Sequence, residues 1–222
     1  MLQKGAIVEA DLTIDGFYNR LFAVTKASGG WRPVLDVSNL LNKFVDLTPF
    51  SMESPRTVMG AVRHLDWMFT IDMKDAYFHV PIHPDSQRYL RFVFEGRVFQ
   101  FKALCFGLSS APQVFTRVLA PLARWLHLLG IRILLYLDDW LILARSLEDA
   151  LRAKTIILTL TNKLGLILNL AKSMLTPSQS VTYLGMVLNS TLMTATPSQK
   201  RIDNMGTLAR EFRLLPANSA HR

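Results

Sequence analysis

Cysteine is almost missing from this sequence: Cys105 is the single one among 222 residues. One thiol cannot form an internal disulfide, and such sparing use of cysteine is typical of a reducing compartment. The N-terminal residues, M-L-Q-K-G-A-I, also lack the apolar stretch of a secretory signal peptide. We therefore expect an intracellular protein, in the cytoplasm or the nucleus, that is not secreted.

Long hydrophobic runs are absent as well. The most apolar stretch, residues 118–144, is interrupted by titratable side chains at Arg124, His127, Arg132, Asp138 and Asp139. A membrane-spanning helix needs about 18 or more uninterrupted apolar residues, so we expect this stretch to be protein core and expect no membrane partner. The chain contains no internal repeat and no low-complexity tract, and its length suits one domain or a large domain with a smaller lobe.

Acidic residues are fewer than basic ones. Lys and Arg number 25 against 17 Asp and Glu, which gives a net charge of +8. This balance suits a polyanionic partner such as nucleic acid, although many enzymes of other kinds are equally basic. Half of the residues are hydrophobic, which is enough for a sizeable core and excludes disorder of the chain as a whole.

Residues 131–144 place two carboxylates, Asp138 and Asp139, side by side between two apolar runs of strand length. The pattern predicts a β-hairpin whose tight turn holds both acids. Taken alone, the pair fits a solvated turn, because turns favour Asp. However, the turn lacks the Gly that hairpins prefer, and its flanks are too apolar for a surface ribbon. Two carboxylates fixed in a cleft usually require a cation.

A third carboxylate, Asp72, ends the apolar strand predicted over residues 67–72. Asp is rarely buried at such a place unless it is paired or bound to a metal. A structural salt bridge is the alternative, but together with Asp138 and Asp139 we favour a functional role. The three acids are therefore our candidates for a metal-dependent site.

The remaining elements are predicted from periodicity, caps and turns. They are hairpins over residues 21–37 and 90–101, helices beginning near Ser110 and Ser146 and ending at Gly130 and Gly165, a short strand over 166–170, an apolar hairpin over 181–188 and a basic helix over 198–214. The order of strand, helix, hairpin, helix and strand predicts an α+β fold. It is the ferredoxin-like split β-α-β arrangement, with an antiparallel sheet and helices on one face.

Six segments resemble the motifs of the reverse transcriptase family, in that family's order. They are W-R-P-V-L-D-V-S-N-L (31–40) for the fingers, T-I-D-M-K-D-A-Y-F-H-V-P-I (70–82), C-F-G-L-S-S-A-P-Q-V-F (105–115) and Y-L-D-D (136–139) for the first three catalytic motifs, G-L-I-L-N-L-A-K-S (165–173) for the fourth, and V-T-Y-L-G (181–185) for the primer grip. With Phe106 before Gly107, the second motif is similar to that of retrotransposon enzymes of the DIRS-like and gypsy-like groups.

This resemblance implies a polymerase palm with a partial fingers subdomain. The fingers would be residues 1–66, the palm 67–190 with a fingers insertion over about 80–104, and the start of a thumb or connection, or a disordered tail, 191–222. The implied activity is that of an RNA-directed DNA polymerase. It joins a primer 3′-hydroxyl to a deoxynucleoside triphosphate on an RNA or DNA template.

The resemblance also implies roles for individual residues. Asp72, Asp138 and Asp139, with the carbonyl of Met73, would hold two Mg²⁺ ions, for which Mn²⁺ is an alternative, and Lys172 would act on the leaving pyrophosphate. The nucleotide-binding residues would be Lys26 and Arg32 at the triphosphate, Asp75, Ala76 and Tyr77 at the sugar, and Phe106 and Gly107. Tyr77 would exclude a ribose 2′-hydroxyl, and Tyr183, Leu184 and Gly185 would form the primer grip.

Two other hypotheses stay open. The chain begins abruptly within the expected fingers and leaves too little length for a full thumb or a ribonuclease H domain, so we expect those parts in a larger polyprotein. The chain is alternatively a truncated retroelement remnant that binds nucleic acid without polymerase activity. An RNA-binding module on the same scaffold is the weaker hypothesis, because such modules use exposed aromatic residues on the sheet face.

Overall fold

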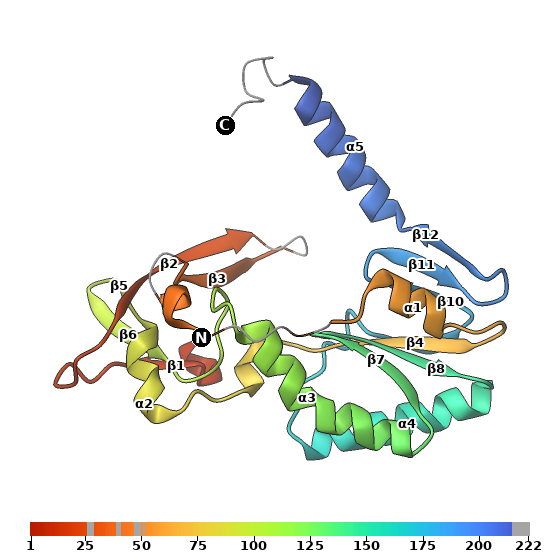
Figure 1. Cartoon of the computed structure of the whole chain (residues 1–222), viewed down its shortest axis with the longest axis horizontal. Coiled ribbons are helices and arrows are strands. Elements are labelled where there is room, and N and C mark those ends of the chain that lie inside the picture. The colour runs from red at the N-terminus through yellow and green to blue at the C-terminus, as the bar shows by residue number, and fades with distance from the viewer. Residues whose placement is uncertain (26–28, 39–40, 47–49, 51, 215–222) are drawn as a thin grey trace. The chain divides into compact units, whose positions relative to one another are not determined.

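The computed structural model describes residues 1–25, 29–38, 41–46, 50 and 52–214, and their chain path is drawn in Figure 1. The chain divides into two compact units: unit 1 comprises Met1–Met52 and Met73–Trp125, and unit 2 comprises Glu53–Asp72 and Leu126–Arg222. The units are defined by contacts and not by function. The boundaries expected for fingers, palm and thumb therefore stay a prediction.

Unit 1 is built on a five-stranded sheet of order β1-β6-β5-β2-β3. Its strands are β1 (Ile7–Glu9), β2 (Tyr18–Thr25), β3 (Trp31–Asp36), β5 (Arg91–Phe94) and β6 (Arg97–Phe101). Neighbouring strands are antiparallel except for the parallel pair β2 and β5. The two hairpins predicted from Gly-containing turns, β2–β3 and β5–β6, are both confirmed.

The core of unit 1 lies against one face of this sheet. It comprises Ile7, Leu35, Val37, Leu90, Phe92, Phe99, Phe101 and Cys105. Unit 1 also contains most of α3 (Ala111–Leu128) and several short helical segments: η1 (Leu2–Lys4), η2 (Leu41–Phe44), η3 (Ala76–His79), α2 (Pro84–Gln87) and η4 (Arg88–Leu90). Burial raises the pKa of the Cys105 thiol to about 12, so this cysteine is a packing residue and not a nucleophile.

Unit 2 contains the predicted split β-α-β arrangement, with an antiparallel sheet of order β7-β8-β4-β9. Its elements in chain order are β4 (Trp67–Asp72), the end of α3 (Ala111–Leu128), β7 (Arg132–Tyr136), β8 (Asp139–Ala144), α4 (Leu147–Lys163) and β9 (Met174–Ser178). The predicted strand over residues 67–72 is therefore confirmed to the residue, and the Asp-Asp hairpin is confirmed as β7 and β8.

The two faces of this sheet are covered by different elements (Figure 1). Helix α4 packs on one face, against β8, β4 and β9. Its N-cap is Ser146, as predicted, whose hydroxyl accepts a hydrogen bond from the Asp149 amide at 3.1 Å. The other face is covered by α1 (Pro55–Ala61) and by a second sheet of β10 (Ser180–Tyr183), β11 (Met186–Asn189) and β12 (Thr194–Pro197).

The last elements of unit 2 agree with most of the sequence predictions. The β10–β11 hairpin turns at Leu184 and Gly185, which both have positive φ (47° and 73°), as a type I′ turn requires. The predicted basic helix is present as α5 (Gln199–Leu214). Among the residues described, no helix combines the length and the apolarity needed to cross a bilayer.

The strand predicted over residues 166–170 is wrong. Only Leu168 makes a single bridge, and Leu170 is largely exposed. The backbone turns at Asn169, whose amide donates to the carbonyl of Asp72 at 2.8 Å and whose carbonyl accepts from Lys172 and Ser173 at 3.1 and 3.0 Å. These bonds to a distant strand override the local apolar pattern, and the strand begins only at Met174.

A buried ion pair joins three segments at the end of the sheet away from Asp72. The Asp66 carboxylate is fully buried and accepts two bonds from the Arg132 guanidinium, at 2.9 and 2.8 Å. It also accepts from the Arg63 amide at 2.7 Å, and the Asp66 carbonyl accepts from the Ser190 hydroxyl at 2.6 Å. Through its carboxylate and its carbonyl, Asp66 thus connects the start of β4 to the start of β7 and to the end of β11.

Replacing Asp66 by Asn should therefore destabilise the fold. We expect the free energy of unfolding to fall by about 3 kcal/mol, the lower end for breaking a buried ion pair, because the Arg132 side chain keeps 26% exposure. Urea unfolding followed by circular dichroism measures the change. The matched control is Glu9→Gln, which removes the exposed pair with Arg97 and should leave stability nearly unchanged. Equal effects of the two substitutions would refute this role of Asp66.

Candidate active site

The pairing of β4 with β8 brings two of the predicted acids together. Asp72 lies directly opposite Asp139 in the antiparallel ladder, and residues so opposed have Cβ atoms about 5 Å apart. Side chains alternate along a strand, so Asp72 shares a face with Met68, and Asp139 shares a face with Leu141. Met68 and Leu141 belong to one core cluster. The two carboxylates therefore project from the same face, at the same end of the sheet.

The third acid, Asp138, lies in the turn between β7 and β8. Tyr136 pairs with Asp139, so the loop consists of Leu137 and Asp138 alone. The expectation that both acids lie in the turn is therefore wrong for Asp139, which is the first residue of β8. The tight turn is possible without Gly because Leu137 itself adopts a left-handed conformation, with φ of 53°. This is a strained conformation for a bulky residue, and such strain is concentrated at functional sites.

The pKa of Asp139 is affected by the two other acids. Burial and the negative charges of Asp138 and Asp72 together raise its pKa to about 6, while the positive charge of Lys172 opposes the shift. The backbone of Asp72 is held from the Lys172 segment, because its amide donates to the Ser173 hydroxyl at 3.0 Å. Three carboxylates and one lysine thus influence one another at this end of the sheet.

These residues fit a magnesium site that is completed by its substrate. In the described parts of the chain, His, Cys, Asp and Glu side chains do not gather into a group of three that could enclose a metal ion. Mg²⁺ is commonly bound by only one or two carboxylates together with substrate phosphates. Burial and the crowding of negative charge both raise the pKa of Asp139, and a divalent cation would relieve that crowding. The predicted carbonyl ligand, Met73, follows Asp72 directly in the chain.

The predicted primer-grip hairpin contacts strand β8. The Tyr183 hydroxyl donates to the backbone carbonyl of Asp139 at 3.1 Å, and the Tyr183 side chain is almost fully buried. Burial and the nearby Asp139 charge raise the pKa of Tyr183, so the phenol stays protonated and able to donate. Leu184 and Gly185 form the turn beside it, where the Gly185 carbonyl accepts from the Ser198 amide at 2.9 Å.

In unit 1, the predicted nucleotide-binding residues include an aromatic cluster. The Tyr77 ring lies 4.8 Å from that of Phe106 and 5.6 Å from that of Phe115, measured between centroids. The Arg32 guanidinium lies over the Phe106 ring, 4.7 Å from its centroid. Tyr77 is 8% exposed, so packing fixes its ring. Phe115 was not among the predicted site residues, although it lies in the second motif.

Gly107 is required by a close backbone approach. Its φ is +107°, and a Cβ built there would lie 1.9 Å from the carbonyl oxygen of Leu35. The Leu35 amide donates to the Phe106 carbonyl at 2.9 Å, and the Asn42 side chain donates to the Gly107 carbonyl at 2.9 Å. Strand β3 and η2 therefore hold the Phe106–Gly107 loop in place, and only glycine fits the second position.

Asp75 and Ala76 begin η3, in which Tyr77 lies. Ala76 is buried, whereas Asp75 has a left-handed backbone and forms an ion pair with Lys4. Lys26, the other predicted triphosphate ligand, lies outside the described residues. Lys4 and Asn42 were missed from the sequence, because no local pattern relates them to partners 71 and 65 residues away.

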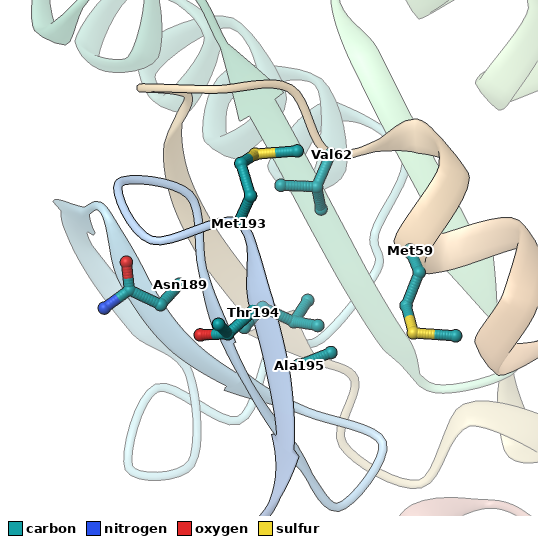
Figure 2. Close-up of a pocket in the computed structure, with 7 residues that line it drawn as sticks. Met59, Val62, Asn189, Met193, Thr194 and Ala195 are labelled. Carbon is teal, nitrogen blue, oxygen red and sulfur yellow. The ribbon is translucent and has the colours of Figure 1, made fainter.

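A small apolar pocket lies elsewhere in unit 2, between α1 and the β11–β12 hairpin (Figure 2). Its volume is about 90 Å³, and it is lined by Met59, Val62, Leu188, Asn189, Met193, Thr194 and Ala195. None of these side chains titrates in the ordinary pH range, and none is a predicted site residue. This pocket therefore carries no catalytic argument.

Solved structures with a similar fold come from foamy viruses. The foamy viral protease-reverse transcriptase in complex with double-stranded DNA aligns with a TM-score of 0.79 and 24% identity, covering 92% of this chain and 34% of that one. The same viral protein in complex with an RNA/DNA hybrid aligns with a TM-score of 0.74 and 24% identity, covering 92% and 26%. The fold is thus the mixed α+β fold of a palm-type polymerase domain.

Sequence comparisons identify the family. The Gag-Pol polyprotein of Walleye dermal sarcoma virus is 30% identical over 171 residues, which is 76% of this chain and 10% of the polyprotein. The genome polyprotein of Petunia vein clearing virus (isolate Shepherd) is 27% identical over 146 residues, 66% of this chain and 6% of the polyprotein. The chain spans a small fraction of these curated relatives.

The family model described as "Reverse transcriptase (RNA-dependent DNA polymerase)" matches residues 24–188. The chain therefore belongs to the reverse transcriptase family of nucleotidyltransferases, as its motifs predicted. The matched region contains Asp72, Asp138 and Asp139 as well as the aromatic cluster around Tyr77.

The crowding of carboxylates predicts how stability depends on pH. Because folding raises the pKa of Asp139 from 3.8 to about 6, the folded chain binds this proton more tightly than the unfolded chain. The contribution of Asp139 to stability should fall as pH rises between these two values and level off above them. Asp138→Asn removes one repulsive neighbour and should make the fall smaller.

Thermal melting from pH 4 to pH 8, with and without Mg²⁺, measures this effect as the difference between wild type and variant. Mg²⁺ should raise the melting temperature of the wild type above pH 6, and should do so less in Asp138→Asn. The exposed Asp15→Asn serves as the control and should follow the wild type. Identical profiles for Asp138→Asn and the wild type would contradict the coupling.

Proposed function

We propose that this chain is the polymerase domain of an RNA-directed DNA polymerase that extends a primer with deoxynucleoside triphosphates on an RNA or DNA template. The observation that carries the proposal is the register of β4 and β8, which sets Asp72 opposite Asp139 beside Asp138, in a chain of this family. The similar foamy virus proteins bind double-stranded DNA and an RNA/DNA hybrid, which supports a template-primer duplex as the partner.

The proposed reaction joins the primer 3′-oxygen to the α-phosphorus and breaks the bond from that phosphorus to the bridging oxygen, releasing pyrophosphate. The two Mg²⁺ ions, or Mn²⁺ in their place, would supply charge neutralisation and a more acidic primer hydroxyl. The carboxylates of Asp72, Asp138 and Asp139 and the carbonyl of Met73 would hold them. Little covalent work is left to the protein, so positioning and electrostatics carry the rate.

Lys172 is proposed to neutralise or protonate the leaving pyrophosphate. Its charge acts on the carboxylate of Asp139, whose pKa it lowers. The adjacent Ser173 hydroxyl accepts from the Asp72 amide. The segment that carries Lys172 is therefore tied to the strand that carries the first acid, which suits a cation that acts beside the carboxylates.

The nucleotide would be bound by residues of unit 1. Arg32 and Lys26 are proposed to grip the triphosphate, Asp75, Ala76 and Tyr77 to line the sugar pocket, and Phe106 and Gly107 to contact the nucleotide. The Tyr77 ring packs against the rings of Phe106 and Phe115 and is held by them. A ring held in this way suits a rigid group that rejects a ribose 2′-hydroxyl by collision. Tyr183, Leu184 and Gly185 would hold the primer end.

The parent element is proposed to be a retrotransposon of the DIRS-like or gypsy-like groups. The support is the sequence of the second motif, with Phe106 before Gly107. Because the matched relatives are polyproteins, we propose that this domain works beside others, such as a ribonuclease H domain, in a larger protein. Its site of action would be intracellular, in the cytoplasm or the nucleus.

Primer extension on a poly(rA) template with an oligo(dT) primer, dTTP and Mg²⁺ tests the activity. Asp139→Asn should lower the rate constant about 10³-fold or more, because losing a metal ligand removes several kcal/mol of transition-state stabilisation. Asp15→Asn should keep full activity. If the wild type binds the template-primer but incorporates nothing, the chain is the inactive remnant of the alternative hypothesis.

The role of Tyr77 is tested by sugar selection. Tyr77→Ala should reduce the preference for dTTP over UTP at least about tenfold, because the ring that blocks the 2′-hydroxyl is removed. The measured quantity is the ratio of the two kcat/KM values. Tyr89→Ala, at a tyrosine that is 39% exposed, is the control and should leave the ratio unchanged. An unchanged ratio in Tyr77→Ala would exclude Tyr77 as the selecting residue.

A further inference from the structure

An ion pair connects the N-terminal segment to the first catalytic motif. The Lys4 ammonium donates to the Asp75 carboxylate, across 71 residues of sequence and within unit 1. The two side chains are 50% and 24% exposed. The Lys4 ammonium is therefore paired with a residue two positions before Tyr77, and this pairing holds the Lys4 side chain in place.

Lys4 lies in an N-terminal segment whose backbone is fixed by hydrogen bonds. The Met1 carbonyl accepts from the amides of Lys4 and Ala6, at 3.1 and 3.3 Å, and the turn ends at Gly5 with φ of 64°. Strand β1 then pairs with β6, and the Ala6 carbonyl accepts from the Lys102 amide at 2.9 Å. The backbone of Lys4 is therefore fixed relative to the end of β6.

Asp75 is the residue whose conformation begins η3. Its backbone is left-handed, with φ of 51° and ψ of 43°, a conformation that residues other than glycine adopt at a steric cost. The Asp75 carbonyl accepts from the Phe78 amide at 2.8 Å, and the Tyr77 carbonyl accepts from the Val80 amide at 3.1 Å. A strained residue of this kind persists only where its surroundings hold it, and Lys4 holds its side chain.

The segment after η3 is attached to the residues that directly follow β6. The Val80 carbonyl accepts from the Leu104 amide at 2.8 Å, and the Ile82 amide donates to the Lys102 carbonyl at 2.8 Å. The segment from Asp75 to Ile82 is thus held at its end by backbone bonds and at its beginning by the ion pair. Lys4 therefore holds the beginning of the segment that carries Tyr77.

We propose that Lys4 is a positioning residue for nucleotide binding. By holding Asp75 in its left-handed conformation, Lys4 presets η3, and with it the Tyr77 ring and the amides of Ala76 and Tyr77, before the nucleotide arrives. This inference rests on the proposed polymerase function. Because Lys4 and Asp75 both lie in unit 1 and the ion pair presets the nucleotide-binding turn, its loss should weaken nucleotide binding and leave the chemical step unchanged.

Steady-state primer extension with Lys4→Gln tests the proposal. We expect the KM for dTTP to rise about two- to fivefold, the range that a partly exposed ion pair supports, with kcat unchanged. Lys4→Arg should restore the KM because it keeps the charge. Lys43→Gln, which removes one exposed lysine of η2, is the matched control and should leave KM at the wild-type value.

A second measurement does not depend on activity. In the nucleotide-free protein, hydrogen exchange of the Phe78 amide should become about two- to fivefold faster in Lys4→Gln, and not in Lys43→Gln. Unchanged exchange overturns the proposal, and so does faster exchange with an unchanged KM. If the wild type incorporates no nucleotide, the polymerase function fails separately. Faster exchange would then show that Lys4 orders η3, but the proposed role in nucleotide binding would fall.

Discussion

The backbone pairing of β4 with β8 is the constraint on which the rest of this structure depends. It sets Asp72 opposite Asp139, and a shift by one residue would turn one of the two carboxylates to the other face. The register is fixed by burial on both faces. Met68, Leu141 and Leu143 lie in the cluster beneath α1 and β10–β12, while Trp140 and Ile142 are fully buried on the other face. The hydrophobic core therefore determines where the acids meet.

Bringing the acids together costs stability, and the surrounding residues compensate for that cost. Burial and the negative charges of Asp138 and Asp72 raise the pKa of Asp139, and the left-handed conformation of Leu137 strains the turn. Around them, Tyr183 binds the Asp139 carbonyl, while Asn169 and Ser173 bind the backbone of Asp72. The backbone at each strand end is thus held by hydrogen bonds, and a preorganised site needs such a fixed backbone.

Periodicity and caps were sufficient to predict the elements whose stability is local. Strand β4 ends at Asp72 and α4 begins after Ser146, as the apolar pattern and the cap residue predicted. The prediction failed where distant residues decide. The run over 166–170 forms no strand because the Asn169 amide bonds to the carbonyl of Asp72. Asp139 belongs to β8 and not to the turn because Leu137 adopts a strained, positive φ, which shortens the turn.

In the candidate site, too, local sequence patterns predicted some features, and contacts between distant residues decided others. Its acids were predicted from the apolar runs that flank them, and the roles of the remaining site residues rest on the resemblance to the family. The contacts of Lys4 and Asn42 could not be predicted, because they join residues far apart in the sequence without any repeating pattern. Local sequence patterns thus predict the candidate acids, whereas the long-range contacts that hold the candidate site in place are visible only in the structure.

The proposed function requires that one end of the β4–β8 pair holds a divalent cation between its acids. The most direct measurement is anomalous X-ray scattering from crystals of the protein grown with Mn²⁺, a template-primer and a deoxynucleoside triphosphate. We expect an anomalous peak within coordination distance of carboxylate oxygens of both Asp72 and Asp139. Manganese bound elsewhere, with these two carboxylates turned away from any metal, would contradict it.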